Sequence, residues 1–507
     1  MTKRTVLLIG TILLAALLTG CVPGPQSKAP PTSVSVERTN TPGAVQAVPA
    51  PTLPGDSPSA QPADVAALTA TDPPTAQPSP TDTPQPTRTP APSPSSTDTP
   101  TLTPIPPAPA VPLPAELRET MDAIEAEMEE LRGLEELEPL SRSLMSREEL
   151  STYMEKMLQN DYPPEEMAAD VRVLAAFEFV PPDFDLQGLL LEMYSTQILG
   201  LYDDEVDTLY VVTDDIELGR GDLGLMDRLT FAHEYVHGLQ DEHFRLDTFI
   251  DEEQLNDDEI LSRMALVEGD ATLSMTEYLF AHRDEITPKD MEELQGGGSE
   301  SSSAILANAP AIIVETFEFP YIYGLEFVTA VQGQGWGAVD AAFVDPPRST
   351  EQILHPEKYW AGDEPQIISL PPLTDTLGAG WLLVEAETLG EFQTRLYLEQ
   401  RLDRATAAQA SEGWDADRYA LYAKDDADLL VFATEWDTPQ DREEFVDAYT
   451  TFTEGRYRLT GTPADQQQVW WDGGLENTVL RWGDTSALII IGPDRETVAK
   501  SLAELGR

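Results

Sequence analysis

The chain has 507 residues and a formal net charge of −59, from 31 Lys and Arg against 90 Asp and Glu. This length exceeds that of an ordinary single domain. A surface this acidic would be repelled by nucleic acid and by anionic headgroups, so we expect no nucleic-acid partner. The single cysteine excludes disulfides within the chain, so disulfides contribute nothing to its stability.

Residues 1–21 have the features of a targeting segment. Lys3 and Arg4 precede an apolar stretch, Val6 to Leu18, which is short for a membrane span. The stretch leads into Leu18-Thr19-Gly20-Cys21, which resembles the bacterial lipobox. The resemblance implies a signal peptide, lipidation of Cys21 and an extracytoplasmic protein held at the cell membrane by its lipid. The alternative is an uncleaved membrane anchor, which would also leave the remainder outside the cytoplasm.

Residues 22–114 predict a disordered stalk. Most of the 43 prolines fall before residue 115, among Thr, Ser and Ala, with few aromatic residues. Such a composition cannot build a core and favours an extended, polyproline-like chain. At about 3.1 Å per residue the stalk reaches at most roughly 280 Å. Its Ser and Thr residues also permit O-glycosylation.

Order is expected from residue 115 onward. Apolar residues recur at helical spacing from Leu117 to Leu131, and further helices are predicted over 147–159 and 164–178. The β-rich runs 197–202 and 208–212 flank an acidic turn, which predicts a hairpin. An exposed strand edge can pair with an extended peptide, so we expect one of these two strands to lie along a cleft.

A helix predicted from Leu225 to Phe244 carries the motif H-E-x-x-H, from His233 to His237. Residues four apart share one helix face, so His233 and His237 can bind one metal ion together. Glu234 would then lie beside a metal-bound water, where a carboxylate can act as general base. The alternative is a surface helix with two unrelated histidines.

Two residues compete as third metal ligand. His243 has the spacing of the third histidine in H-E-x-x-H-x-x-G-x-x-H, but Gln240 replaces the glycine at which the helix would turn back to the metal. Glu268 lies on the apolar stripe of a second predicted helix, where an unpaired carboxylate would be costly. A buried pair between Glu268 and Arg263 or Arg228 is the alternative role. We predict His233, His237 and Glu268 as the ligands.

The motif and the segment 265–271 together resemble the gluzincin group of zinc metallopeptidases, over roughly residues 190–285. The resemblance implies a zincin-like, mostly helical core, a Zn²⁺ cofactor, Glu234 as the base and Glu268 as the third ligand. It also implies an Asp four residues after Glu268, where this chain has Thr272. Asp241, one turn beyond His237, is a second candidate for orienting a histidine ligand.

Zincins commonly use a Tyr or His to stabilise the oxyanion of the reaction. Tyr323, on a predicted apolar helix within 310–331, and His355, in a turn-rich segment, are the candidates. A structural role is the alternative for each. The glycine- and serine-rich stretch 296–303 is expected to be a surface loop, and could serve as a lid.

The C-terminal part predicts an α+β domain without a catalytic constellation. Strands are expected at 417–422, 429–433, 468–471, 478–482 and 487–491, with helices at 441–452 and 495–505. Its tryptophans could bind sugars if exposed, but packing against a sheet is the more common role.

The sequence therefore predicts an α+β protein with four segments: a signal peptide (1–21), a stalk (22–114), a zincin-like metallopeptidase domain (115–362) and a C-terminal α+β domain (363–507). Its expected function is hydrolysis of peptide or protein substrates by a zinc-activated water, with Glu234 as general base. The alternative is a non-catalytic surface lipoprotein that binds a partner or cell-wall polymer and carries a structural zinc site.

Overall fold

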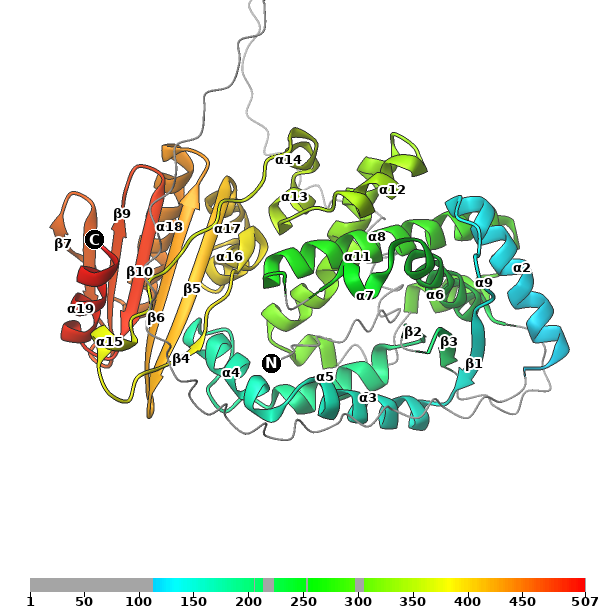
Figure 1. Cartoon of the computed structure of the whole chain (residues 1–507), viewed down its shortest axis with the longest axis horizontal. Coiled ribbons are helices and arrows are strands. Elements are labelled where there is room, and N and C mark those ends of the chain that lie inside the picture. The colour runs from blue at the N-terminus through cyan, green and yellow to red at the C-terminus, as the bar shows by residue number, and fades with distance from the viewer. Residues whose placement is uncertain (1–112, 205, 213–222, 252–253, 297–304, 507) are drawn as a thin grey trace, which may run out of the picture. The chain divides into compact units, whose positions relative to one another are not determined.

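The computed structural model describes residues 113–506 except 205, 213–222, 252–253 and 297–304, and has an α+β fold (Figure 1). The signal peptide, Cys21 and nearly all of the stalk lie outside the described residues, as does most of the loop predicted at 296–303. Among the described residues, no helix combines the length and the apolar character needed to cross a membrane.

The first part of the fold contains a small three-stranded sheet. Its strands are β1 (Ser141–Met145), β2 (Gly200–Asp203) and β3 (Thr208–Val212), in the order β1-β3-β2. β2 and β3 are antiparallel, with Gly200 opposite Val211, so the predicted hairpin is confirmed. β1 runs parallel to β3, a pairing that the sequence did not indicate. The hairpin leaves β2 at an edge of the sheet.

Helices make up the rest of this part of the fold. They are α2 (Ala115–Arg132), α3 (Arg147–Asp161), α4 (Pro164–Ala176), α5 (Leu186–Gln197), α6 (Leu225–Phe244), α7 (Leu246–Phe249), α8 (Asp257–Ala281), α9 (Pro288–Gly296), α11 (Ala311–Gln332), α12 (Trp336–Val344), α13 (Thr350–Leu354) and α14 (Pro356–Ala361). The predicted helix from Leu225 to Phe244 is confirmed as α6, and it ends at Arg245 in the left-handed conformation. Helix α6 packs against β2 and β3.

Helices α8 and α11 approach each other closely because glycines meet at their contact. A Cβ atom on Gly324 would lie 2.2 Å from the carbonyl oxygen of Ala265, and one on Gly269 would lie 2.2 Å from that of Gly324. Real side chains do not tolerate such distances, so only glycine allows this approach. At its start, α8 is capped by Asn256, whose side chain accepts from the Glu259 amide while the Glu259 carboxylate accepts from the Asn256 amide.

The C-terminal part is built on one seven-stranded antiparallel sheet, in the order β4-β5-β6-β10-β9-β8-β7. Its elements are α15 (Thr374–Leu377), β4 (Leu382–Glu385), α16 (Gly390–Glu399), α17 (Arg404–Ser411), β5 (Trp414–Lys424), β6 (Ala427–Trp436), α18 (Pro439–Tyr457), β7 (Thr462–Asp465), β8 (Gln468–Asp472), β9 (Asn477–Trp482), β10 (Ser486–Gly492) and α19 (Arg495–Leu505). All five strands predicted from the sequence are confirmed; β4 and β7 were not predicted.

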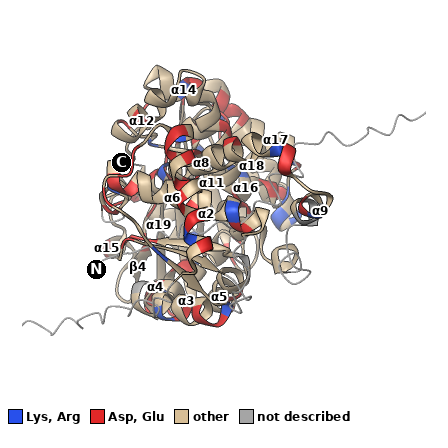
Figure 2. Cartoon of the chain, turned by 90° about the vertical axis from the view of Figure 1, so that its right-hand side faces the viewer, with Lys and Arg blue, Asp and Glu red and all other residues tan. Residues whose placement is uncertain are grey.

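Alternate residues of these strands enter two separate cores. Leu430 and Phe432 of β6 pack with α16, α17 and α18, whereas Leu429 and Val431 pack with α19 and the segment before α15. Helices therefore cover both faces of the sheet, as Figure 1 shows. Trp414, Trp436 and Trp471 are fully buried, so these tryptophans pack in the core. Figure 2 shows Asp and Glu recurring over many of the helices, with fewer Lys and Arg.

Candidate metal centre

Helix α6 brings His233 and His237 together. Both side chains are fully buried, and their rings meet edge to face with centroids 4.6 Å apart. Their Nε2 atoms lie 3.0 Å from each other. The spacing of four residues has therefore placed two imidazole nitrogens at one point, as expected for neighbours on one helix face.

Glu268 completes the group from α8. Its Oε2 atom lies 3.2 Å from His233 Nε2 and 3.5 Å from His237 Nε2. Two donors bonded to one tetrahedral zinc ion are about 3.3 to 3.5 Å apart, since each bond is about 2.0 to 2.1 Å. The three side chains, hereafter the metal cluster, thus fit the ligand set His-His-Glu. They are the only group of three or more such side chains found among the described residues.

The electrostatics of the metal cluster suit a cation. Burial raises the pKa of Glu268, but the charge of His237 and hydrogen bonds from both histidines outweigh it and lower the pKa to about 2. Burial lowers the pKa of His237, but Glu268 and Glu234 outweigh it and raise the pKa. Glu268 is therefore ionised beside a charged His237, and a divalent cation among the three side chains would take the place of that charge when His237 loses its proton.

Glu234 lies between α6 and strand β2. Its side chain is fully buried, and its Oε2 atom accepts a hydrogen bond of 3.0 Å from the backbone amide of Tyr202. β2 can come this close because Gly200 has no side chain. A Cβ atom at this position would lie only 2.8 Å from Glu234 Cγ. β2 therefore lies against Glu234 with all four of its residues buried, and the expectation of a strand along a cleft stays a prediction.

Tyr321 of α11 is the site residue that the sequence analysis missed. Its ring stacks on His233 with centroids 6.4 Å apart, and its hydroxyl hydrogen-bonds Glu268. Burial, then Glu268 and Glu234, raise its pKa well above the usual value, so the phenol stays protonated and can donate. Tyr321 stands three residues before Gly324 and so shares the helix face that packs on α8, a face that the structure identifies and the sequence does not.

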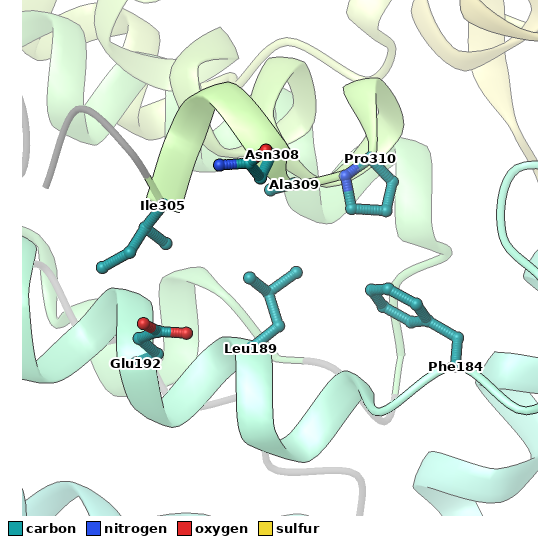
Figure 3. Close-up of a pocket in the computed structure, with 7 residues that line it drawn as sticks. All are labelled: Phe184, Leu189, Glu192, Ile305, Asn308, Ala309 and Pro310. Atoms are coloured by element: carbon teal, nitrogen blue, oxygen red, sulfur yellow. The ribbon is translucent and has the colours of Figure 1, made fainter. Parts of the chain in front are cut away.

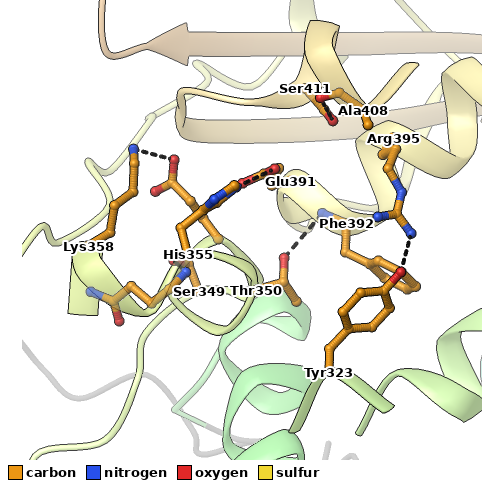
Figure 4. Close-up of polar contacts among 12 residues, drawn as sticks. Tyr323, Ser349, Thr350, His355, Lys358, Glu391, Phe392, Arg395, Ala408 and Ser411 are labelled. Atoms are coloured by element: carbon orange, nitrogen blue, oxygen red, sulfur yellow. Dashed lines mark hydrogen bonds and ion pairs between the residues drawn. The ribbon is translucent and has the colours of Figure 1, made fainter. Parts of the chain in front are cut away.

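Tyr323 and His355 lie elsewhere (Figure 4). The Tyr323 hydroxyl accepts hydrogen bonds from Arg395 at 3.2 Å and Arg404 at 3.4 Å. His355 pairs with Glu391, with 3.0 Å between His355 Nε2 and Glu391 Oε1. In the described part of the chain, none of their recorded contacts involves the metal cluster. The structure therefore does not bring these two predicted residues to the metal ligands.

The structure also shows where the two other candidates on α6, His243 and Asp241, lie. His243 stays on the helix, and its Nε2 atom lies 2.9 Å from the carbonyl oxygen of Glu135, away from the metal cluster. Asp241 accepts from the Tyr202 hydroxyl and the Leu246 amide, so it does not orient a histidine ligand. That position is taken by Gln240, whose Oε1 atom lies 2.8 Å from His237 Nδ1.

A separate cavity of about 440 Å³ lies between α5 and the segment leading into α11 (Figure 3). It is lined by Phe184, Leu189, Glu192, Ile305, Asn308, Ala309 and Pro310. No metal-cluster residue is among the described residues that line it. Tyr321 follows Pro310 by eleven residues on α11, which corresponds to about 16 Å along a helix.

Comparison with known proteins yields one match. A family model described as a domain of unknown function (DUF8575) matches residues 382–501. No curated protein and no solved structure matches the chain.

The matched region begins at the first residue of β4 and ends within α19. It therefore corresponds to the seven-stranded sheet and the helices that cover it. The metal cluster, Glu234 and Tyr321 all precede it, so the match carries no information about their chemistry.

Proposed function

We propose that the chain is a zinc-dependent metallopeptidase that hydrolyses peptide bonds in peptide or protein substrates. The observation that carries the proposal is the convergence of His233 Nε2, His237 Nε2 and Glu268 Oε2 within 3.0 to 3.5 Å of one another, beside Glu234. Three protein donors, rather than four, are typical of catalytic zinc sites, which keep one position for water or substrate. The proposed architecture around this site is zincin-like.

Zinc bound by these residues would polarise a peptide carbonyl and activate a water molecule for attack. Glu234 would accept the proton of that water and deliver it to the leaving amine. Tyr321, which stays protonated, would donate a hydrogen bond to the oxyanion that develops on the substrate. The backbone of β2, at the edge of its sheet, would pair with the extended substrate.

The lipobox-like sequence ending at Cys21 supports an extracytoplasmic location, with the protein anchored in the membrane by its lipid. The proline-rich stretch 22–114 would then separate the folded part from the membrane surface.

One observation favours a second candidate, a non-catalytic lipoprotein with a structural metal site. His233, Glu234 and His237 are fully buried, and Glu268 is 2% exposed. A substrate could reach them only if a neighbouring element moved, whereas a structural metal needs no such access. The two candidates differ in whether Glu234 is needed for a reaction or only fills space.

The deciding experiment compares wild type with Glu234→Gln on the full chain. Zinc content is measured by elemental analysis, and hydrolysis is followed with an unbiased pool of peptides. We expect wild type to hold about one zinc and to cleave peptides, and Glu234→Gln to keep the metal and lose cleavage by a factor of at least about 10². Glu242→Gln is the matched control, since Glu242 lies on the same helix and bonds to the amides of Leu137 and Glu138.

Cleavage that survives in Glu234→Gln would overturn the mechanism. Zinc in wild type with no cleavage of any peptide would favour the structural site. Absence of zinc from wild type would overturn both candidates.

A further inference from the structure

His237 is held by a side chain that leaves it no choice of tautomer. Gln240 Nε2 donates two hydrogen bonds, to the carbonyl oxygen of Val267 at 3.0 Å and to Asp270 Oδ2 at 2.9 Å. Both amide hydrogens are thereby used, and Gln240 Oε1 must face His237 Nδ1, 2.8 Å away. An amide oxygen can only accept, so His237 Nδ1 carries a proton, and Nε2 is the ring nitrogen left to present a lone pair when a metal binds.

The amide of Gln240 is oriented in turn by a buried ion pair. Asp270 Oδ1 accepts from Arg132 Nε at 2.7 Å, and both side chains are fully buried. Turning the Gln240 amide over would set its oxygen against Asp270 Oδ2 and against the Val267 carbonyl. Two acceptors facing each other in a buried site are strongly unfavourable, so the ionised Asp270 fixes the direction of the amide.

Arg132 is itself held from three sides. Besides Asp270, its guanidinium contacts Asp340 of α12 at 2.8 Å and lies 4.7 Å from the centre of the Trp336 ring. Burial lowers its pKa, but Asp270 and Asp340 outweigh it and raise the pKa, so the charge is kept. The last residue of α2 therefore neutralises a carboxylate two residues from the ligand Glu268.

We propose that Arg132, Asp270 and Gln240 form a positioning chain that fixes the tautomer and ring orientation of His237 for metal binding. The proposal rests on the metal site of the proposed function, but not on peptidase activity. Within this positioning chain, Arg132 and Gln240 both donate to Asp270, and His237 donates to Gln240. None of these three residues is a metal ligand, and the proposal assigns their effect on the metal to His237, the ligand whose side chain Gln240 contacts.

The test measures apparent zinc affinity by competition with a chromophoric chelator, and the absorption spectrum of the Co²⁺-substituted protein. Gln240→Met, which keeps the length of the side chain but removes its polar atoms, should weaken zinc binding about 10- to 100-fold. Gln240→Glu should weaken it as well, because the new carboxylate would face Asp270. Arg142→Met is the matched control: Arg142 also bridges two carboxylates, Asp122 and Glu125, but far from the ligands in the hydrogen-bond network.

The decisive variant is the double substitution Gln240→Glu with Asp270→Asn. In this variant the carboxylate lies at position 240, where it accepts from His237 and from the new amide at position 270. The oxygen of that amide accepts from Arg132. Only the Val267 carbonyl loses its donor. We expect it to regain at least about tenfold of the zinc affinity lost by Gln240→Glu alone, and to return the Co²⁺ spectrum toward that of wild type. A role limited to packing predicts no such recovery, because the double variant changes no volume.

Wild-type affinity in Gln240→Met, or a double variant no better than Gln240→Glu, would overturn the positioning chain while leaving the metal site intact. A Gln240→Met protein that fails to fold moves the decision to the double variant, which keeps side-chain shape. A wild type that binds no zinc would overturn the metal site and the positioning chain together. Zinc binding with the expected variant pattern but no peptide cleavage would support the positioning chain and sink only the peptidase.

Discussion

Two clusters of buried carboxylates in this molecule differ in the groups that surround them. In the metal cluster, two imidazole nitrogens and a carboxylate oxygen point at one spot. In the second, hereafter the interface cluster, the carboxylates of Asp258, Glu351, Glu391 and Asp417 come from α8, α13, α16 and β5, respectively (Figure 4 shows part of it).

Each carboxylate of the interface cluster has its own donor. Thr350 donates to Asp258 through its amide and its hydroxyl, Lys358 contacts Glu351 at 2.6 Å, and His355 contacts Glu391 at 3.0 Å. The main-chain amides of Leu389 and Gly390 and the Trp414 indole donate to Asp417. Every carboxylate of the interface cluster thus has a donor from the protein, although Glu391 Oε2 is buried without a hydrogen bond, whereas the three ligand atoms of the metal cluster converge on one point. Convergence of acceptors, more than burial of charge, marks the binding site.

Chelation should affect only one of the clusters. With free zinc at about 1,000 times its dissociation constant, binding to the native state adds about 4 kcal/mol of stability, so removing the metal should lower the melting temperature by several degrees. Differential scanning calorimetry with and without a chelator measures this. Glu268→Ala should abolish the difference, and His355→Gln, in the interface cluster, should retain it. A chelator shift that persists in Glu268→Ala would place the metal elsewhere.

The two tyrosines of α11 offer a matched pair. Tyr321→Phe removes the hydroxyl beside Glu268 and should reduce peptide hydrolysis by about 10² to 10³, which is roughly 3 to 4 kcal/mol, with zinc content unchanged. Tyr323→Phe removes a hydroxyl that serves Arg395 and Arg404, and should leave hydrolysis near the wild-type rate. Steady-state rates on one cleaved peptide check both. Equal losses in the two variants would show that the effect comes from α11 packing.

The tyrosines also show what sequence reasoning could and could not supply. Helical spacing was enough to select His233, His237 and Glu268 as candidate ligands, because the place of each residue on its own helix can be derived from that helix alone. Choosing between Tyr321 and Tyr323 required the contact between α8 and α11, which Gly269 and Gly324 determine. The hairpin β2–β3 is local and was predicted, whereas the parallel pairing of β1 with β3 spans a long stretch of chain and left no local signal.

The same limit explains the neighbours of His237. Asp241 was a reasonable orienting group by its place one turn along α6, but the helix turns its carboxylate toward Tyr202. In the sequence, Gln240 was informative only because it replaces the glycine that would allow His243 to bind the metal. Its role depends on Asp270 and Arg132, which come from two other helices. Contacts among three elements cannot be read from the periodicity of any one of them.

The interface cluster should give stability a particular pH dependence. Burial raises the pKa of Asp417 to about 6, although hydrogen bonds from Leu389, Trp414 and Gly390 oppose the rise. The native state therefore binds more protons than the unfolded state between about pH 4 and 6. The stability contributed by Asp417 is fully present below about pH 4 and is lost as pH rises through 6, by at most about 3 kcal/mol.

Urea unfolding at several pH values, with excess chelator so that metal release adds nothing, measures this dependence. The difference in unfolding free energy between wild type and Asp417→Asn should shrink as pH rises from 4 to 7, because the variant does not titrate at this position. A difference that is constant with pH would mean that Asp417 is ionised throughout, and that the interface cluster resembles the metal cluster in holding a full negative charge.

The smallest expected effect is the loss of a helix cap, which tests whether metal binding depends on the stability of α8. Asn256→Ala removes the cap of α8, the helix that carries Glu268, and Ser146→Ala removes the equivalent cap of α3. Each should lower the free energy of unfolding by about 1 kcal/mol. Neither should change zinc affinity, since Glu268 lies three turns beyond Asn256 and is held by its packing against α6 and α11. If Asn256→Ala weakens zinc binding in proportion to its loss of stability and Ser146→Ala does not, the position of Glu268 depends on the whole length of α8. The metal cluster would then draw its geometry from the folding of that helix, and the contrast with the interface cluster would be sharper still.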